Sequence, residues 1–264
     1  MHDFNYHKTS NIEEAVKVHM GAEDGTYMAG GQTLLPTLKQ RLAAPTDIID
    51  IAGVTELNTI TVSDDVSLGS MATHASVANS SEVSSAIPAL ATLAAGIGDP
   101  QVRNRGTIGG SVANNDPAAD YPAACLALNA TITTNRRKIV ADDFFTGMFE
   151  TALEENELIT SVSFPKPDKA AYMKFPNPAS RYAIVGVFVA LFGTDVRVAV
   201  TGAGDNGVFR PTEIENALSS SFTASALDDT TISPDDLLSD IHAQSDYRAS
   251  LIITMAKRAV AAAS

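Results

Sequence analysis

The amino-acid sequence predicts a mixed α+β fold with a larger N-terminal part and a smaller C-terminal part. Short strand-like and helix-like patterns follow one another through residues 1–165, and no repeat of roughly 20 to 50 residues is visible. Residues 165–169 (PKPDK) have the composition of a linker. Beyond them, strand-like runs come first and helix-like runs follow. We therefore expect two domains, at 1–166 and 170–264.

The composition limits the possible classes of function. Of the 264 residues, 45% are hydrophobic, which is typical of a folded chain with a sizeable core. The formal net charge of −13 argues against binding to nucleic acid or to an anionic membrane surface. The single cysteine, Cys125, allows neither an internal disulfide nor an iron–sulfur cluster, and its apolar neighbours predict burial. Neither a signal peptide nor an apolar run of about 18 residues is visible, so we expect a cytoplasmic protein.

Helices and strands alternate at the start of the first domain. Ser10 and Glu13 form a capping box, and Pro36 suits the first turn of a helix. The expected elements are a helix over 10–20, a strand over 26–28, a helix over 36–42 and a strand over 46–51.

Beyond Glu56 the pattern changes to hairpins and short helices. Alternation interrupted at Asp64 and Asp65 predicts a hairpin over 58–68. Residues 99–120 are so rich in Gly, Asn, Asp and Pro that we interpret them as a long loop. The other expected elements are helices over 73–78, 87–96 and 122–128 and strands over 130–134, 138–141 and 158–164.

The second domain is expected to contain a three-stranded sheet and helices. Gly202–Gly207 matches the G-x-G-x-x-G pattern of dinucleotide-binding folds. The next helix begins only at Pro211, so we interpret the match as a turn. Strands are expected over 171–175, 183–192 and 196–201 and helices over 211–218 and 247–262, with a polar, aspartate-rich segment over 219–246.

Residues 28–36 (MAGGQTLLP) form the first candidate binding segment, in which a strand leads into two glycines, two polar residues and the start of a helix. Glycines allow a ligand to approach the backbone closely, and successive free N–H groups form a nest for an anion. The helix that follows adds positive potential, and Thr33 adds a hydroxyl. This chemistry suits a pyrophosphate, but an ordinary glycine turn has the same signature.

Residues 103–111 (RNRGTIGGS) form the second candidate segment. Paired glycines are again flanked by hydroxyls, on Thr107 and Ser111. Arg103 and Arg105 either contact an anion or neutralise nearby carboxylates. Two such loops together favour a dinucleotide whose diphosphate lies between them.

Residues 114–120 (NNDPAAD) form the third candidate segment. Asp116 either caps a helix that begins at Pro117, or one of the two carboxylates, Asp116 or Asp120, binds a ribose or ribityl hydroxyl. The five histidines lack metal-ligand spacing, and no catalytic triad is visible. We therefore expect no metal ligand and no catalytic residue in this chain.

Five segments together resemble the FAD-binding medium subunit of the xanthine dehydrogenase and carbon monoxide dehydrogenase family of molybdenum hydroxylases. The resemblance covers most of the first 165 residues and weakens beyond them. It implies a FAD-binding domain with subdomains at about 1–54 and 55–166, followed by a small α/β domain with a three-stranded sheet. The segments are AGGQTLLPTLKQRLAAPTDIIDI (29–51), LGSMATHASV (68–77), QVRNRGTIGGSVANNDPAADYPAACLALNATI (101–132), DFFTG (143–147) and ELITSVSFP (157–165).

The same resemblance implies which residues bind FAD. The two glycine loops would hold the diphosphate, and Asp120 would bind the polyol or ribose region. Ile97 would lie against the flavin nucleotide, and Ile159 and Lys174 against the isoalloxazine ring. Thr33 stands where serine is usual, which keeps the hydroxyl. The implied set is Ala29, Gly30, Gly31, Gln32, Thr33, Leu34, Thr73, Ile97, Thr107, Gly109, Gly110, Ser111, Asp120, Ile159 and Lys174.

The function that the resemblance implies is electron transfer within a hetero-oligomer. Two [2Fe-2S] clusters in a small partner subunit would pass electrons through FAD to an external acceptor such as NAD or a quinone. A large partner subunit would hold the molybdopterin cofactor and the substrate. Two rivals remain open: a self-sufficient flavin oxidoreductase, and a non-enzymatic nucleotide-binding module.

Overall fold

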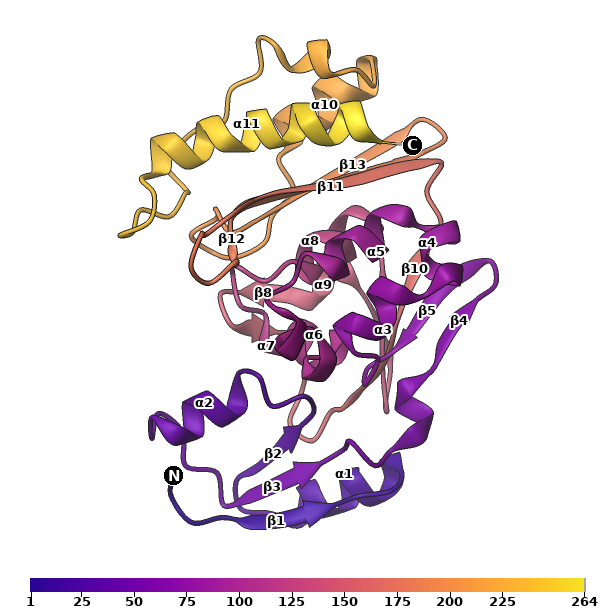
Figure 1. Ribbon diagram of the computed structural model, residues 1–264, viewed down its shortest axis with the longest axis vertical. Helices are drawn as coiled ribbons and strands as arrows, with labels where there is room; N and C mark the ends of the chain where they lie inside the picture. The colour runs from indigo at the N-terminus through magenta and orange to yellow at the C-terminus, as the bar shows by residue number, and fades with distance from the viewer. Residues whose placement is uncertain (264) are drawn as a thin grey trace.

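Three β-sheets, placed one after another along the long axis of the molecule, organise the computed structural model, which describes residues 1–263 (Figure 1). A small N-terminal sheet lies at one end, and a five-stranded sheet with most of the helices lies in the middle. A third sheet, covered by the C-terminal helices, forms the other end. The predicted α+β fold with a three-stranded C-terminal sheet is thereby confirmed.

The N-terminal sheet is parallel and has the strand order β1-β3-β2. Its central strand contributes Ile49, which shares a buried apolar cluster with Ala15 of the first helix. The strand β1 was not predicted because its short sequence is largely polar. The elements are β1 (Asn5–Lys8), α1 (Ile12–Gly21), β2 (Gly25–Met28), α2 (Leu34–Lys39), β3 (Asp47–Asp50) and the 3-10 helix η1 (Thr55–Asn58).

The cap of α1 lies one residue beyond the predicted capping box. Asn11 accepts a hydrogen bond from the backbone N–H of Glu14 at 2.8 Å. The Glu14 carboxylate in turn accepts from the backbone N–H and the hydroxyl of Ser10, both at 2.8 Å. Asparagine caps helices as well as serine does, so the sequence contains two equally good N-cap residues for α1, Ser10 and Asn11.

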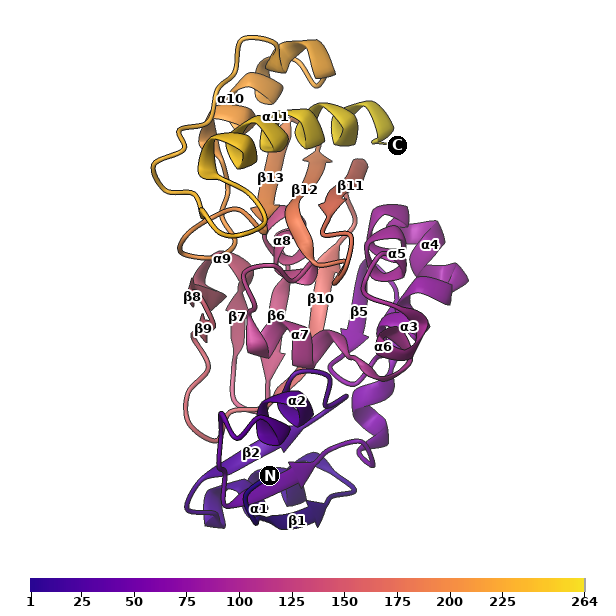
Figure 2. The ribbon, with the colours of Figure 1, turned by 60° about the vertical axis from the view of Figure 1, so that its left-hand side comes forward.

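The middle sheet is antiparallel, with the order β4-β5-β10-β6-β7, and α3 to α8 pack beside it (Figure 2). A two-stranded hairpin, β8–β9, lies near α9. The strands are β4 (Ile60–Val62), β5 (Asp65–Gly69), β6 (Thr131–Thr134), β7 (Lys138–Val140), β8 (Phe145–Gly147), β9 (Glu150–Thr151) and β10 (Ile159–Pro165), and the helices are α3 (His74–Asn79), α4 (Ser81–Ala86), α5 (Pro88–Ala95), α6 (Pro100–Arg105), α7 (Ile108–Asn114), α8 (Tyr121–Ala127) and α9 (Ala141–Phe144).

The segment 99–120, interpreted from its sequence as a loop, contains the two helices α6 and α7. Asp99 caps α6 by accepting from the Val102 N–H at 2.8 Å, and Thr107 caps α7 by accepting from the Gly110 N–H at 3.2 Å. Ile108 of α7 is fully buried in the main core. Packing and caps therefore outweigh the poor helix propensity of the glycines.

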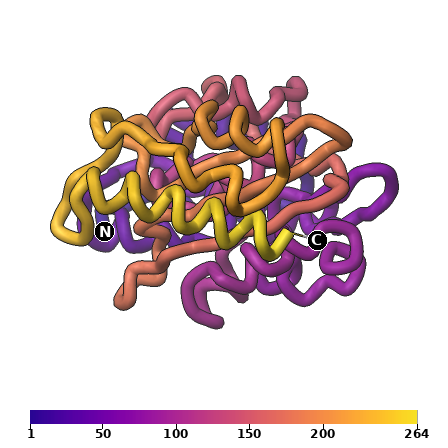
Figure 3. Tube along the Cα trace, turned by 90° about the horizontal axis from the view of Figure 1, so that it is seen from above, coloured from indigo at the N-terminus to yellow at the C-terminus, as the bar shows by residue number. Residues whose placement is uncertain are grey.

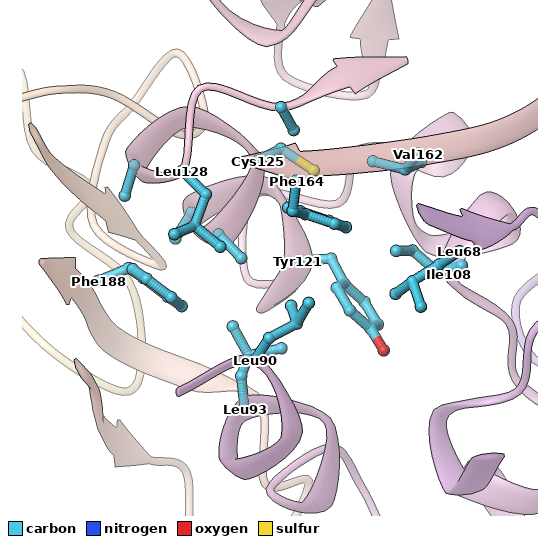
Figure 4. Packing of buried hydrophobic residues seen from close by; sticks show 14 of the residues in the cluster. Leu68, Leu90, Leu93, Ile108, Tyr121, Cys125, Leu128, Val162, Phe164 and Phe188 are labelled. Carbon is cyan, nitrogen blue, oxygen red and sulfur yellow. The ribbon is translucent and has the colours of Figure 1, made fainter. Parts of the chain in front are cut away.

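The main core lies between these helices and the middle sheet (Figure 4). Tyr121, Phe164 and Leu90 are fully buried there, and each such side chain contributes about 1.5–3 kcal/mol through the hydrophobic effect. Cys125 is also fully buried, as predicted. Burial raises the pKa of the Cys125 thiol, which keeps it protonated and unreactive.

The C-terminal sheet is antiparallel, with the order β11-β12-β13, and α11 runs along its outer face (Figure 3). Val187 of β12 faces the cluster under α11, whereas Phe188 joins the main core. The sheet is therefore buried on both faces, which explains the continuous apolar run of β12. The elements are β11 (Lys169–Pro176), β12 (Ala183–Phe192), β13 (Asp195–Thr201), α10 (Thr212–Ser220), the 3-10 helix η2 (Ala224–Leu227) and α11 (Ser245–Ala262).

Gly202–Gly207 forms the predicted turn after β13, in which Gly202 and Gly207 have φ of 83° and 101°. Within residues 1–263, no helix has both the length and the hydropathy needed to cross a membrane.

Candidate functional site

A cavity of 610 Å³ lies where the N-terminal sheet, α6 and α7, and the loop between β11 and β12 meet. Its volume falls in the range of small-molecule and cofactor sites. The lining residues come from segments far apart in the sequence: Thr26, Tyr27, Ala29, Gly30, Gly31, Gln32, Thr33, Leu34, Thr37, His74, Ile97, Gly98, Val102, Gly106, Thr107, Gly110, Ser111, Ala113, Asn114, Asp116, Ala119, Asp120, Ser180, Arg181 and Tyr182.

The first glycine loop, residues 29–34, lines the cavity along its whole length. Gly31 has a φ of 70°, a conformation that favours glycine. Within the part of the chain that the structure describes, the backbone N–H groups from Gly30 to Thr33 have no hydrogen-bond acceptor. Gly30 and Gly31 are partly buried and Gln32 and Thr33 are exposed, so these N–H groups are accessible to a ligand. A consecutive run of such groups suits an anion.

The two glycine loops touch each other. A Cβ atom on Gly30 would lie 2.0 Å from the carbonyl oxygen of Arg105 and 2.9 Å from the Cα of Gly106. A Cβ on Gly110 would lie 3.7 Å from the Cβ of Ala29. Figure 2 shows the corresponding arrangement, with the segment from β2 to α2 next to α7. Glycine at position 30 is therefore required by space.

The second glycine loop contributes mainly side chains and the surface of Gly110, because the N–H groups of residues 108–111 already donate hydrogen bonds within the protein. The N–H groups of Ile108 and Gly109 donate to carbonyls of the segment that precedes α3, at 3.0 and 2.9 Å. Thr107, Gly110 and Ser111 line the cavity. Gly109 does not line it and lies against Ser70, whose Cβ would be 2.5 Å from a Cβ at this position.

Asp120 reaches the cavity wall from the position just before α8. Its side chain is 5% exposed and accepts hydrogen bonds from the Tyr172 hydroxyl and from Lys174 Nζ, the latter at 3.1 Å. Lys174 also donates to the carbonyl of Gly96 at 2.8 Å. Burial raises the pKa of Asp120, while the Lys174 ammonium opposes that rise. Lys174 thus lies behind Asp120 and does not itself line the cavity.

Three further residues of the expected set lie in different surroundings. Ile97 lines the cavity, and its carbonyl accepts from Arg103 at 3.0 Å. Thr73 does not line the cavity, and its hydroxyl caps α3 by accepting from the Ser76 N–H at 3.1 Å. Ile159 is buried in the main core at the start of β10.

Asp116 does not cap a helix. The helix expected at Pro117 begins at Tyr121, and Asp116 accepts from the Ala118 N–H at 2.9 Å in a turn. Asp116 lines the cavity, and burial raises the pKa of its carboxyl group. The Pro117 signal therefore belongs to a turn that carries the chain into the cavity wall.

Several cavity residues were not selected from the sequence. His74 and Tyr27 line the cavity from α3 and β2. Arg181, which has a φ of 64°, and Tyr182 reach it from the loop after β11. Burial, with a smaller effect of the Arg103 cation, lowers the pKa of His74 to about 4, so its imidazole is neutral at neutral pH. Of these four residues, only His74 could have been selected from the sequence, because it follows Thr73 in a segment that resembles the family.

Comparison with known proteins supplies the family. Residues 2–167 match the family model described as the FAD binding domain in molybdopterin dehydrogenase. The chain is 36% identical to the nicotine 6-hydroxylase medium subunit of Paenarthrobacter nicotinovorans, over 97% of this chain and 95% of the relative. It is 33% identical to the carbon monoxide dehydrogenase medium chain of Hydrogenophaga pseudoflava, over 98% and 96%.

The chain belongs to the FAD-binding medium subunits of the molybdenum hydroxylases.

Solved structures agree with this family. The quinoline 2-oxidoreductase structure from Pseudomonas putida 86 superposes with a TM-score of 0.88 at 28% identity, covering 98% of this chain and 96% of that one. Carbon monoxide dehydrogenase from Hydrogenophaga pseudoflava gives 0.86 at 32% identity, with the same coverage. The chain is thus the FAD-binding medium subunit of a multi-subunit molybdenum hydroxylase, which confirms the resemblance seen in the sequence.

The cavity of this medium subunit fits FAD. The free N–H groups of residues 30–33 suit a diphosphate, and Asp120 offers a buried carboxylate to hydroxyl groups. Arg181 adds a positive charge to the wall. Among residues 1–263, no group of three or more His, Cys, Asp or Glu side chains is placed to hold a metal ion.

Proposed function

We propose that this medium subunit holds FAD in the 610 Å³ cavity and connects the electron chain of its complex to an external acceptor. Bound FAD supplies the redox chemistry of the junction, because a flavin exchanges electrons singly or in pairs. The chain itself binds, orients and shields the cofactor. The observation that supports this most directly is the run of free backbone N–H groups at Gly30–Thr33, next to a second glycine loop that lines the same cavity.

We assign the cofactor contacts as follows. The loop 29–34 would bind the diphosphate, with Thr107, Gly110 and Ser111 on the opposite side. Asp120 would accept a hydroxyl of the ribityl or ribose region, and Ile97 would pack against the nucleotide. Lys174 would act mainly on Asp120, because its ammonium already contacts that carboxylate at 3.0 Å.

The rest of the electron chain belongs to partner subunits in this proposal. A small subunit would carry two [2Fe-2S] clusters, since the one cysteine of this chain is buried. A large subunit would carry the molybdopterin cofactor and choose the substrate. Relatives named for nicotine and carbon monoxide share this fold, which supports placing substrate choice outside the medium subunit. The acceptor would be a small molecule such as NAD or a quinone.

The test is to purify the chain alone and together with its partner subunits and to record visible absorption spectra. Oxidised-flavin bands in the isolated chain, with FAD released on denaturation, are expected. Iron–sulfur absorbance should appear only in the complex. Addition of the substrate of the complex should bleach the flavin bands only when all three subunits are present.

Other outcomes lead to different conclusions. A flavin-loaded chain that oxidises a substrate without partners would instead support a self-sufficient oxidoreductase. A chain that stays colourless and takes up no added FAD, but retains another nucleotide, would refute the proposal in favour of a nucleotide-binding module.

A further inference from the structure

His74 is the histidine that lines the cavity among residues 1–263, and it lies against Gly106 of the second glycine loop. Its side chain belongs to the first residue of α3 and the residue is 5% exposed. Its backbone N–H donates to the carbonyl of Gly106 at 2.9 Å, and the neighbouring Thr73 forms a β-bridge with Thr107. The backbone at His74 is therefore tied to this loop.

Glycine at position 106 leaves space for this imidazole. Gly106 has φ −61° and ψ 142°, a conformation that any residue adopts, so its backbone does not require glycine. A Cβ at this position, however, would lie 2.6 Å from Nε2 and 2.8 Å from Cδ2 of His74. The Cα of Gly106 is also one of the three atoms nearest to a Cβ on Gly30, together with the carbonyl group of Arg105. The imidazole thus lies where the two glycine loops meet.

The two ring nitrogens of His74 differ in their surroundings. Nδ1 is sealed from solvent and has no hydrogen-bond partner within residues 1–263. Nε2 also has no partner in that part of the chain but, unlike Nδ1, is not sealed. Burial keeps the ring neutral, so it carries one N–H. A buried N–H without an acceptor costs more than a buried lone pair, so the proton belongs on Nε2, the nitrogen with access to the cavity.

We propose that His74 is a FAD-binding residue that donates its Nε2–H to an oxygen of the cofactor at the junction of the two glycine loops. The acceptor is a phosphate or hydroxyl oxygen, because those groups must pass this junction if the diphosphate lies on the loop 29–34. The inference rests on the proposed function of the cavity. It adds a neutral donor to a site in which the second loop has no free amide in the first turn of α7.

The test compares two variants of the full-length chain after FAD removal. His74→Phe keeps a planar ring but removes both nitrogens, whereas His74→Gln places an amide N–H close to the position of Nε2. FAD affinity is measured by fluorescence titration, and the melting temperature of the FAD-free chain is measured in parallel. We expect His74→Phe to raise the Kd about 10-fold and His74→Gln to stay within about 3-fold of the wild type.

A spectroscopic measurement on the wild-type chain avoids dependence on variants. In a chain labelled with ¹⁵N-histidine, NMR should show His74 as the Nε2–H tautomer, and the Nε2 signal should shift when FAD is added. An Nδ1–H tautomer in the FAD-bound chain would overturn the proposal, as would equal Kd values for the wild type and His74→Phe. A wild-type chain that binds no FAD at all would instead refute the function proposed for the cavity.

Discussion

Replacing Gly30 with alanine tests whether the contact between the two glycine loops builds the cofactor site. The new methyl group would lie 2.0 Å from the Arg105 carbonyl oxygen and 2.7 Å from its carbonyl carbon. These are backbone atoms, which cannot rotate away as a side chain can. Ordinary contact begins at 3.4 Å, so the loop 29–34 must shift away from α6 and α7 by more than an ångström.

Such a shift displaces the free N–H groups of residues 30–33 from the position proposed for the diphosphate. A hydrogen bond to a charged oxygen contributes about 1.5–3 kcal/mol, so loss of two costs about 3 kcal/mol. This corresponds to a weakening of FAD binding by about 100-fold. The overpacked contact should also lower the melting temperature by a few degrees, because such strain costs about 1–3 kcal/mol.

The assay is a fluorescence titration of the FAD-free chain with FAD, together with a thermal melt. Gly21→Ala is the matched control, because a Cβ on Gly21 has no atom within 4 Å. It should bind FAD as the wild type does. If Gly30→Ala also bound FAD with an unchanged Kd, the loop contact would not position the cofactor and this reasoning would be wrong.

Three further predictions concern buried charges. Burial raises the pKa of the Glu157 carboxyl, but hydrogen bonds from the Arg137 guanidinium, the Glu154 N–H and the Thr134 hydroxyl outweigh it and hold the pKa at about 2, against 4.5 for the free group. Its stabilisation should therefore be complete above pH 4.5 and be lost as the pH falls to 2, and Glu157→Gln should flatten acid unfolding in that window. Lys174→Met leaves Asp120 buried without its cation and should destabilise the chain by about 3–5 kcal/mol in urea unfolding. Adding Asp120→Asn to Lys174→Met should recover part of that loss, and an additive double variant would show that the two groups are not coupled. Arg197 donates from two nitrogens to the Leu126 carbonyl at 3.0 and 2.8 Å, so Arg197→Lys should lose about 2 kcal/mol, whereas an unchanged urea midpoint would mean that lysine reproduces the contact.

Local patterns in the sequence predicted most of the strands. The long apolar run of β12 and the alternation around Asp64 each have one simple structural explanation. The helix α7 could not be predicted in the same way, because its residues Gly109 and Gly110 oppose helix formation. The stability of α7 comes from the burial of residues such as Ile108, which depends on the tertiary structure.

The candidate site, too, combines features that the local sequence predicts with features that depend on the tertiary structure. The two glycine loops are local signals, and the structure brings both to one cavity. The partners of Asp120 are Tyr172 and Lys174, which follow it by more than 50 residues and lie on β11 of the C-terminal sheet. Nothing in the residues around Asp120 indicates that contact. The same holds for Arg181, whose place in the wall depends on how the C-terminal sheet packs.

The loop after β11 forms part of the cavity wall, and this limits which parts of the gene could be exchanged by recombination. The segment that matches the FAD-binding family model ends at residue 167, before Tyr172, Lys174 and Tyr182. A gene fragment that encoded only that segment would expose the Asp120 carboxylate and leave one side of the cavity open. We therefore expect that residues 2–167 cannot be transferred by recombination without the C-terminal domain. Exchange between relatives should preserve the two parts as a matched pair.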